Sequence, residues 1–365
     1  MEAKLLQETD RCLHCGSCLS VCPLVNAGVL GSPKKIGVYA AKDARKVNHI
    51  ITTPFNCTFC LACVNVCPVN LPTPEVVKRL RGRIKHSKSI EQLVENVRSS
   101  GNIFGMGNDE RGIWSIELDF PLEERIDAKA EVGYFVGCNS AFAPSLSGIP
   151  VANVTLLERA KVNYMLISDE KCCGMPLVMA GEEGVLAEIA KSNVEEYRKR
   201  GVKVLVTSCP ACLRAWKELY PKVVKVPFKV QHTSQFLLDL ITKNKIKLSK
   251  IDRKVAYQDP CELARGCGIV KEPRLLIKET GALLLEFKEK GLEAECCGGG
   301  GLLRATNPQT STKLAFSKLK EAKLLGAEAI ITACPACKQN LLKAGGNIAI
   351  LDVGELLLAA LPSNP

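Results

Sequence analysis

The sequence predicts a multidomain α+β protein, in which a mostly α-helical N-terminal module precedes two duplicated α/β domains. Three observations support this fold class: two runs of four cysteines near the N-terminus, a set of five cysteines that occurs twice further on, and a strand–helix alternation that starts at Glu131. The predicted divisions are the helical module, a packed linker and the two copies, at residues 1–86, 87–130, 131–250 and 251–365.

The chain has 365 residues, enough for two or three domains with a substantial core, and its 19 cysteines are unusual. No apolar run resembling a signal peptide follows the first residues, and no run reaches the roughly 18 apolar residues of a membrane span. We therefore expect a cytoplasmic protein without a transmembrane segment of its own. In that compartment cysteines bind metal more often than they form disulfides.

The formal net charge is +11 when every thiol is counted as neutral. Cysteines that bind metal are thiolates, so ligand cysteines would cancel much of this excess. Aromatic residues make up only 5% of the chain, and no basic stretch is interleaved with them. This composition argues against nucleic acid as a partner.

The pattern Cys-x-x-Cys-x-x-Cys-x-x-x-Cys-Pro occurs twice near the N-terminus. In two-cluster ferredoxins, three closely spaced cysteines hold one cubane [4Fe-4S] cluster and the fourth holds the other. The spacing predicts two cubane sites, Cys12, Cys15, Cys18 and Cys67 for cluster 1, and Cys22, Cys57, Cys60 and Cys63 for cluster 2. Zinc is the rival interpretation, but zinc sites rarely use cysteines in this pattern. The nearby histidines, His14, His49 and His86, are not needed as ligands.

The segment between the two runs has helical character at residues 37–45, which favours a mostly α-helical ferredoxin module. A helix is predicted from Glu75 to about Lys88, with Pro74 in its first turn. Turn-forming residues interrupt the linker that follows. Three apolar side chains are expected to anchor this linker on a neighbouring domain, those of Trp114, Ile116 and Leu118.

In each copy of the duplicated region a lone cysteine, a Cys-Cys pair and a Cys-x-x-Cys follow one another at nearly the same spacing. Adjacent cysteines do not readily bridge each other, because a vicinal disulfide strains the peptide between them. They can instead offer two thiolates to one cluster. The first set is Cys138, Cys172, Cys173, Cys209 and Cys212, and the second set is Cys261, Cys296, Cys297, Cys334 and Cys337.

The apolar pattern places each group of cysteines at the C-terminal end of a predicted strand. Open α/β sheets carry their sites at that edge, where helix N-termini can stabilise anions. The predicted strands are 132–136, 164–167, 202–206, 255–257, 282–285 and 329–331. The predicted helices are 150–160, 182–200, one near Leu275, and 314–325, with Val230 and 236–240 closing the first copy.

The Cys-x-x-Cys pairs taken alone could also be thioredoxin-like redox pairs. The Cys-Cys pairs upstream favour a larger iron–sulfur site, and Gly174 and Gly298–Gly301 would let the backbone pass close to sulfur atoms. Cys267 has no counterpart in the other copy, and we predict that it is an ordinary free thiol.

The doubled Cys-Cys-Gly architecture behind two ferredoxin runs resembles the D-type polypeptide of heterodisulfide reductase, or a fusion of that enzyme's C and B subunits. The segments Cys172–Leu177, Ser208–Cys212 and Cys297–Arg304 look closer to that branch than to the iron–sulfur subunits of glycolate or lactate oxidases. The resemblance implies two non-cubane [4Fe-4S] clusters, each held by the five cysteines of one set, and therefore four clusters in all. In that family the non-cubane pair splits the coenzyme M–coenzyme B disulfide.

One departure from the family's pattern concerns proton delivery. Where the family commonly has His-Asp-Pro-Cys-His, this chain has Gln258-Asp259-Pro260-Cys261-Glu262. If a histidine there protonates the departing thiolate, His232 or Glu262 would have to replace it, and these two are the catalytic candidates. A histidine placed like His232 is more often a structural residue at a strand end than a catalytic one.

The sequence thus favours an iron–sulfur redox subunit that passes electrons from two cubane clusters to two non-cubane clusters that reduce a disulfide. The alternative is an electron-transfer subunit of a flavin-dependent lactate or glycolate dehydrogenase, without its own substrate. A third is a cytoplasmic member of a membrane complex in sulfur metabolism. No Gly-x-Gly-x-x-Gly follows a strand, so flavin or NAD would belong to a partner chain. The expected redox partner is a flavoprotein or a membrane cytochrome. Through such a partner the chain could associate with a membrane. A solvent-open cavity between the copies would favour the disulfide reductase.

Overall fold

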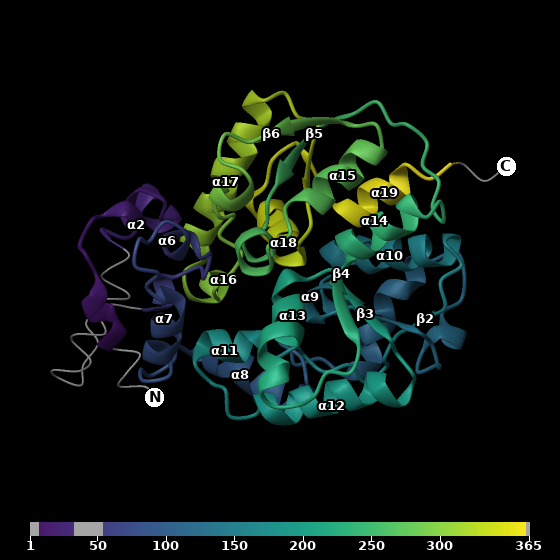
Figure 1. The fold of residues 1–365 in the computed structure, drawn as a ribbon, viewed down its shortest axis with the longest axis horizontal. Helices are drawn as coiled ribbons and strands as arrows, with labels where there is room; N and C mark the ends of the chain where they lie inside the picture. Colours follow the sequence, from purple (N-terminus) through teal and green to yellow (C-terminus); the bar gives the residue numbers. More distant parts are fainter. Residues whose placement is uncertain (1–6, 33–53, 363–365) are drawn as a thin grey trace.

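A computed structural model describes residues 7–32 and 54–362. The N-terminal module lies at one side of the molecule, and the two copies stack beside it, as Figure 1 shows from purple to yellow. The helical character predicted at residues 37–45 and His49 lie outside the described residues. Within the described part of the chain, no helix has the length and apolarity that crossing a bilayer would require.

The described part of the N-terminal module is built from short helices. They are η1 (Thr9–Arg11), α2 (Ser17–Ser20), α3 (Pro23–Asn26), η2 (Pro54–Asn56), α6 (Ala62–Asn65) and α7 (Thr73–Arg81). The segment that follows contains α8 (Lys88–Ser100), η3 (Asn108–Glu117) and η4 (Glu123–Arg125).

The helix predicted from Glu75 to about Lys88 is wrong at its C-terminal end. α7 ends at Arg81 and Gly82 follows it, while α8 is a separate helix inside the predicted linker. The buried residues of α8 recur at helical spacing, as Ile90, Val94 and Val97, so this signal was present in the sequence and was missed.

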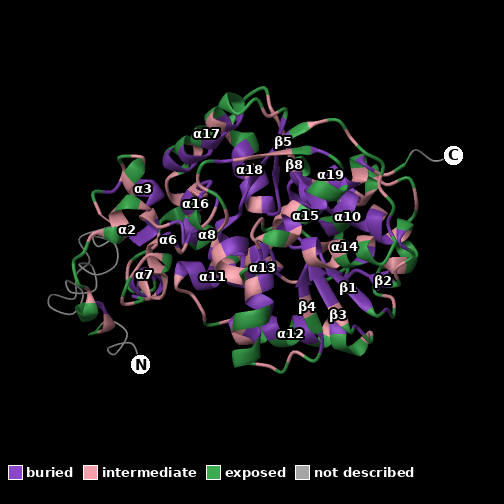
Figure 2. Ribbon diagram, turned by 45° about the horizontal axis from the view of Figure 1, so that its top comes forward, coloured by how far each residue is buried: buried purple, intermediate pink, exposed green. Residues whose placement is uncertain are grey.

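Each copy contains one four-stranded, all-parallel sheet, which confirms the predicted duplication and the α/β class. The first sheet has the order β2-β1-β3-β4 and the second the equivalent order β6-β5-β7-β8. The strands are β1 (Val132–Phe135), β2 (Tyr164–Met165), β3 (Val204–Thr207), β4 (Lys229–His232), β5 (Lys254–Gln258), β6 (Leu283–Glu286), β7 (Ala329–Thr332) and β8 (Ala349–Asp352). In Figure 2 the central strands are buried under helices.

The helices of the first copy are α9 (Cys138–Phe142), η5 (Pro144–Leu146), α10 (Gly148–Arg159), α11 (Met175–Ala180), α12 (Leu186–Lys199), α13 (Pro210–Arg214), η6 (Ala215–Leu219), η7 (Tyr220–Lys222) and α14 (Thr233–Thr242). Those of the second copy are η8 (Glu262–Gly266), α15 (Lys271–Glu279), η9 (Gly291–Glu293), α16 (Leu303–Thr306), α17 (Pro308–Leu324), α18 (Pro335–Ala344) and α19 (Val353–Ala359). β8 and α19 were not predicted from the sequence, although they repeat β4 and α14.

The two copies pack through equivalent helices. α10 of the first copy packs against α19 of the second, and its counterpart α15 packs against α14. Such reciprocal contacts are those of a two-fold dimer, here built within one chain. The helices α13 and η8, which follow strands β3 and β5, are also in contact between the copies.

The segment after α8 contacts the first copy through η3, which packs against α9 and α10, but not through all three expected side chains. Trp114 is buried and Leu118 packs against the main core. Ile116 is 80% exposed, so its predicted anchoring role is wrong. The linker contributes instead a buried arginine, Arg111.

The N-terminal module docks on the second copy through a backbone contact that only glycine permits. Gly301 has φ +63°, and a Cβ atom there would lie 2.3 Å from the carbonyl oxygen of Cys57. The adjacent Gly300 makes a similar contact, since a Cβ atom there would lie 2.9 Å from the carbonyl oxygen of Thr58.

We expect Gly301→Ala to destabilise the protein by clearly more than Gly326→Ala. Gly326 shares the left-handed backbone, with φ +74°, but no atom lies within 4 Å of its Cβ position. The control therefore carries only the left-handed backbone cost of about 1–2 kcal/mol, whereas Gly301→Ala must also move the docked module. Urea unfolding followed by circular dichroism measures both free energies, and equal losses would contradict the docking role of Gly301.

Candidate iron–sulfur centres

All nineteen cysteines lie in the described part of the chain, and none forms a disulfide. No three or more His, Cys, Asp or Glu side chains among the described residues surround a point suited to a single metal ion. An iron–sulfur cluster makes a different demand, because each thiolate binds a separate iron of the cluster. The cysteines of one site need only face a common space.

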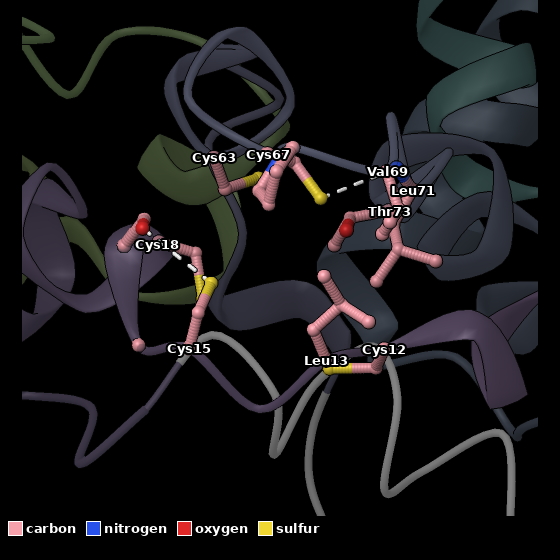
Figure 3. Close-up of a pocket in the computed structure, with 12 residues that line it drawn as sticks. Cys12, Leu13, Cys15, Cys18, Cys63, Cys67, Val69, Leu71 and Thr73 are labelled. Carbon is pink, nitrogen blue, oxygen red and sulfur yellow. Dashed lines mark hydrogen bonds between the residues drawn. The ribbon is translucent and has the colours of Figure 1, made fainter.

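The four cysteines predicted for cluster 1 face one pocket in the N-terminal module. Figure 3 shows Cys12, Cys15, Cys18 and Cys67 lining this pocket, together with Cys63. The backbone N–H of Leu71 donates a hydrogen bond to the Cys67 sulfur at 3.4 Å.

The cysteines predicted for cluster 2 lie close to one another on the inner side of the module. Burial raises the pKa of the Cys63 thiol, and the neighbouring thiols of Cys60, Cys57 and Cys22 raise it further. Burial likewise raises the pKa of Cys57 to about 12, although Arg81 opposes this. Such clustered thiols ionise only when a cation compensates them, as bound iron would do.

Arg81 is a fully buried cation beneath this group. Its guanidinium lies 4.5 Å from the ring centroids of both Phe55 and Phe59, and it donates a hydrogen bond to the Cys57 carbonyl at 2.8 Å. It also donates to the Met179 carbonyl of the first copy at 2.7 Å. Arg81 therefore joins the module to the first copy and places a positive charge near the thiols.

The first set of five cysteines is brought together at the strand ends of the first sheet. Cys138 follows β1 and begins α9, while Cys209 follows β3 and caps α13. The Cys-Cys pair lies between them, and Gly174 N–H donates to the Cys172 sulfur at 3.5 Å. Hydrogen bonds with Cys172 and Cys212 lower the pKa of the Cys173 thiol.

The second set is brought together in the same way in the second sheet. The sulfurs of Cys261 and Cys296 are 3.8 Å apart, and those of Cys297 and Cys337 are 3.1 Å apart. Cys334 packs with the latter pair. Gly298 N–H donates to the Cys296 sulfur at 3.3 Å.

The second set also contacts the N-terminal module. Cys60 of the predicted cluster 2 group packs with Cys261 and Cys296 in one buried cluster. Arg265 fixes this junction, since its side chain donates to the carbonyls of Cys60 at 2.6 Å and Ala294 at 2.8 Å. The module and the second set of cysteines therefore adjoin through sulfur atoms.

The first set instead faces a cavity of about 170 Å³ between the two copies. All five of its cysteines line this cavity, while none of the second set does. The opposite wall comes from the second copy, through Gly299–Gly301, Arg304 and the start of α18 at Pro335 and Ala336. A cluster bound by the five cysteines would itself fill part of this space.

The donor chemistry of all four groups fits iron–sulfur clusters. Each group consists of neighbouring cysteine sulfurs, and in each group one sulfur accepts a backbone N–H. Hydrogen bonds of this kind to cluster sulfurs are one of the means by which proteins set reduction potentials.

His232 is buried within the structure and does not line the cavity. Its Nδ1 accepts the Ser234 N–H at 3.1 Å and its Nε2 donates to the Ser208 carbonyl at 3.1 Å. Burial lowers its pKa to about 4, so the ring is neutral at pH 7. His232 therefore caps α14 and supports the residue before Cys209.

Glu262 also lies outside the lining of the cavity. Its carboxylate accepts a hydrogen bond from Arg214 of the first copy at 2.6 Å. Burial raises its pKa, and Arg214 opposes this. Glu262 and Arg214 form an ion pair between the copies, and they lie close in the sequence to Cys261 and Cys212. Cys267 is partly buried and lies near the Pro210 carbonyl.

A buried ion pair beside the first set was not predicted from the sequence. Arg111 of the linker donates to Glu170 at 2.7 Å, and Glu170 accepts the N–H groups of Val136 and Gly137 at 2.9 Å each. This network holds the turn that presents Cys138. No local motif marks it, because its two charges lie far apart in the sequence.

We expect Arg111→Met to cost about 3–5 kcal/mol of stability, because it leaves Glu170 buried and uncompensated. The matched control is Arg125→Met, which removes a half-exposed pair with Glu158 and should cost about 1 kcal/mol or less. Urea unfolding of the two variants checks this expectation. Comparable small losses would show that Glu170 does not depend on Arg111.

Comparisons with known proteins agree with these sites. The chain matches the 4Fe-4S dicluster domain at residues 8–71 and the cysteine-rich domain at residues 132–216 and 255–342. A solved structure of a hypothetical protein from Helicobacter pylori has the same general fold, with a TM-score of 0.58, 12% identity, and 82% of this chain and 59% of that chain covered.

The chain therefore belongs to the iron–sulfur proteins that join a dicluster ferredoxin domain to two cysteine-rich domains. Within this class it is similar to the D-type polypeptide of the dihydromethanophenazine:CoB–CoM heterodisulfide reductase of Methanosarcina barkeri, with 28% identity over 99% of this chain and 96% of the relative. It is also similar to the B-type polypeptide of a fumarate reductase (CoM/CoB) of Methanothermobacter marburgensis, with 26% identity over 95% of this chain and 71% of the relative. It is thus a redox subunit of the reductase type.

Proposed function

We propose that this chain is the disulfide-reducing subunit of a heterodisulfide reductase-like complex. Its substrate would be the coenzyme M–coenzyme B disulfide or an analogue, which takes up two electrons and two protons to give two thiols. The observation that carries the proposal is the cavity lined by all five cysteines of the first set. In this proposal a cluster fills the part of the space next to the cysteines, and the substrate enters beside it from between the copies, where residues of the second copy form the opposite wall.

The cofactors in this proposal are two cubane and two non-cubane [4Fe-4S] clusters, which supply electrons one at a time. The cubanes would be held by the two N-terminal groups and the non-cubanes by the two five-cysteine sets. The contact of Cys60 with Cys296 supports an order in which the N-terminal groups adjoin the second set and the second set adjoins the first.

The chain's own residues hold this arrangement and exclude water. Cys297 and Cys337 are buried. The side chain of Asn340 fixes the backbone at Cys297 by donating to the Cys297 carbonyl at 2.7 Å. At the first set, Met175 and Pro176 line the cavity beside the cysteines. Apolar surroundings of this kind strengthen electrostatic interactions inside the site.

We expect this chain, purified without its partners, to contain about 16 iron and 16 sulfide ions, the amount that four [4Fe-4S] clusters require. Iron and acid-labile sulfide analysis, normalised to protein from amino-acid analysis, measures this. The control is a protein in which Cys172 and Cys173 are replaced by serine, which should lose about four irons. Zinc, or iron for only two clusters in the unaltered chain, would contradict the four-cluster proposal.

The function is tested by oxidation of reduced methyl viologen with the coenzyme M–coenzyme B disulfide. We expect two viologens oxidised per disulfide, a loss of roughly 100-fold or more in Cys173→Ser, and no change in Cys267→Ser, which lies outside both sets. Failure of the unaltered, iron-loaded complex to oxidise viologen with the disulfide would contradict the proposal.

The second candidate is an electron-transfer subunit without a substrate of its own, serving a flavin-dependent lactate- or glycolate-type dehydrogenase or a similar flavoenzyme. The similarity to a polypeptide of a fumarate reductase favours it, because that relative's name describes reduction of a different substrate. In either case the chain would exchange electrons with a partner, which would be a flavoprotein that holds the flavin or a membrane cytochrome. Association with a membrane would then depend on that partner.

A further inference from the structure

Arg265 lies in a turn that distinguishes the second copy from the first. This turn, η8, is π-helical and follows Cys261 directly, whereas the stretch that begins at Cys138 in the first copy is the ordinary α-helix α9. π-Helical turns are rare and are frequently found at functional sites. Here the turn places the Arg265 side chain at the junction where Cys60 of the N-terminal module packs with Cys261 and Cys296.

The guanidinium of Arg265 is held by backbone carbonyls, but one of its nitrogens is unused. Its Nε donates to the Cys60 carbonyl at 2.6 Å, and its Nη1 donates to the carbonyls of Leu292 and Ala294 at 2.8 Å each. Its Nη2 is buried and has no hydrogen-bond partner among the described residues. Buried polar groups nearly always have a partner, so this donor is available to a group that the neighbouring cysteines would hold.

The positive charge of Arg265 is not paired with a carboxylate. Among the described residues no carboxylate lies within ion-pair distance of it, and the nearby Glu262 pairs with Arg214 at 2.6 Å. The charge acts instead on the cysteines, because it opposes the rise in the pKa of the Cys60 and Cys261 thiols. Arg265 therefore stabilises negative charge on both sides of the junction.

The first set also has an arginine beside its lone cysteine, but there the charge is balanced. Arg111 lies next to Cys138, and its Nε and Nη2 are likewise buried without a hydrogen-bond partner in the described part of the chain. Unlike Arg265, Arg111 forms an ion pair with Glu170. A guanidinium with unused donors is thus common to both sets, whereas its unpaired charge is particular to the second.

We propose that Arg265 is a positioning residue for electron transfer, which donates from Nη2 to sulfur at the junction and raises the reduction potentials of cluster 2 and of the cluster held by the second set. A reduced cluster carries one more negative charge than an oxidised one, so a nearby cation favours the reduced state. Hydrogen bonds to cluster sulfurs also set the potential. The inference rests on the four-cluster part of the proposed function.

The test is a redox titration of the iron-loaded chain, followed by electron paramagnetic resonance. Cys15→Ser and Cys297→Ser assign the signals of cluster 1 and of the second set. In Arg265→Met we expect the ratio of reduced to oxidised cluster at a fixed potential to fall about tenfold at cluster 2 and at the second set, which is about 59 mV for one electron. Cluster 1 should not change, and Arg125→Met, which removes the pair with Glu158, should change no potential.

Iron content is measured in each variant first. If Arg265→Met loses iron, Arg265→Gln replaces it with the same expectation, because it is neutral but can still donate to a carbonyl. Arg265→Lys restores the charge and should recover at least half of the shift. Unchanged potentials in a variant with full iron would overturn the inference, as would an equal shift of cluster 1. Loss of iron from both neutral variants would also overturn it, since Arg265 would then serve to retain the clusters.

The outcomes separate this inference from the proposed function, because no titration contains a substrate. Shifted potentials in a chain that reduces no disulfide would support the role of Arg265 and reject the reductase. Unshifted potentials in a chain that reduces the disulfide would support the reductase and reject the role of Arg265.

Discussion

The close packing of the loop Gly298–Gly301 is the constraint on which the rest of the structure depends. A Cβ atom at Gly298 would lie 2.8 Å from the Ser311 carbonyl oxygen, and one at Gly299 would lie 2.6 Å from the Ala336 carbonyl oxygen. On its other side the loop meets the backbone of the N-terminal module at Cys57 and Thr58. One loop without side chains thus positions the Cys-Cys pair, docks the module and forms a wall of the cavity.

Four buried or partly buried arginines lie beside the cysteine groups around these loops. Arg81 lies beneath the cluster 2 group, Arg265 at its junction with the second set, Arg111 beside Cys138, and Arg304 between the two sets. Arg81 and Arg265 also donate to backbone carbonyls, so they fix the chain as well as its charge. In a low-dielectric interior each such cation counts for far more than a surface lysine.

The two copies share their topology but differ in their surroundings. The first set of cysteines faces the cavity, whereas the second packs against Cys60 of the N-terminal module. The last helix of each copy also has a different N-cap residue, which is His232 for α14 in the first copy and Asp352 for α19 in the second. Because both side chains accept the N–H two residues later, His232 is best understood as the structural counterpart of an N-cap aspartate.

The sequence alone determined the fold class, the duplication and the grouping of cysteines, because parallel strands carry their sites at one edge and cysteine spacing is a local property. It placed most strands and helices within a few residues, but it ended α7 too late, missed α8 and did not assign β8. The tertiary structure alone decided that Cys60 meets Cys296, that Glu262 pairs with Arg214, and that Arg304 faces the first set. Those contacts join residues from different domains, and no local spacing specifies how two packed surfaces meet.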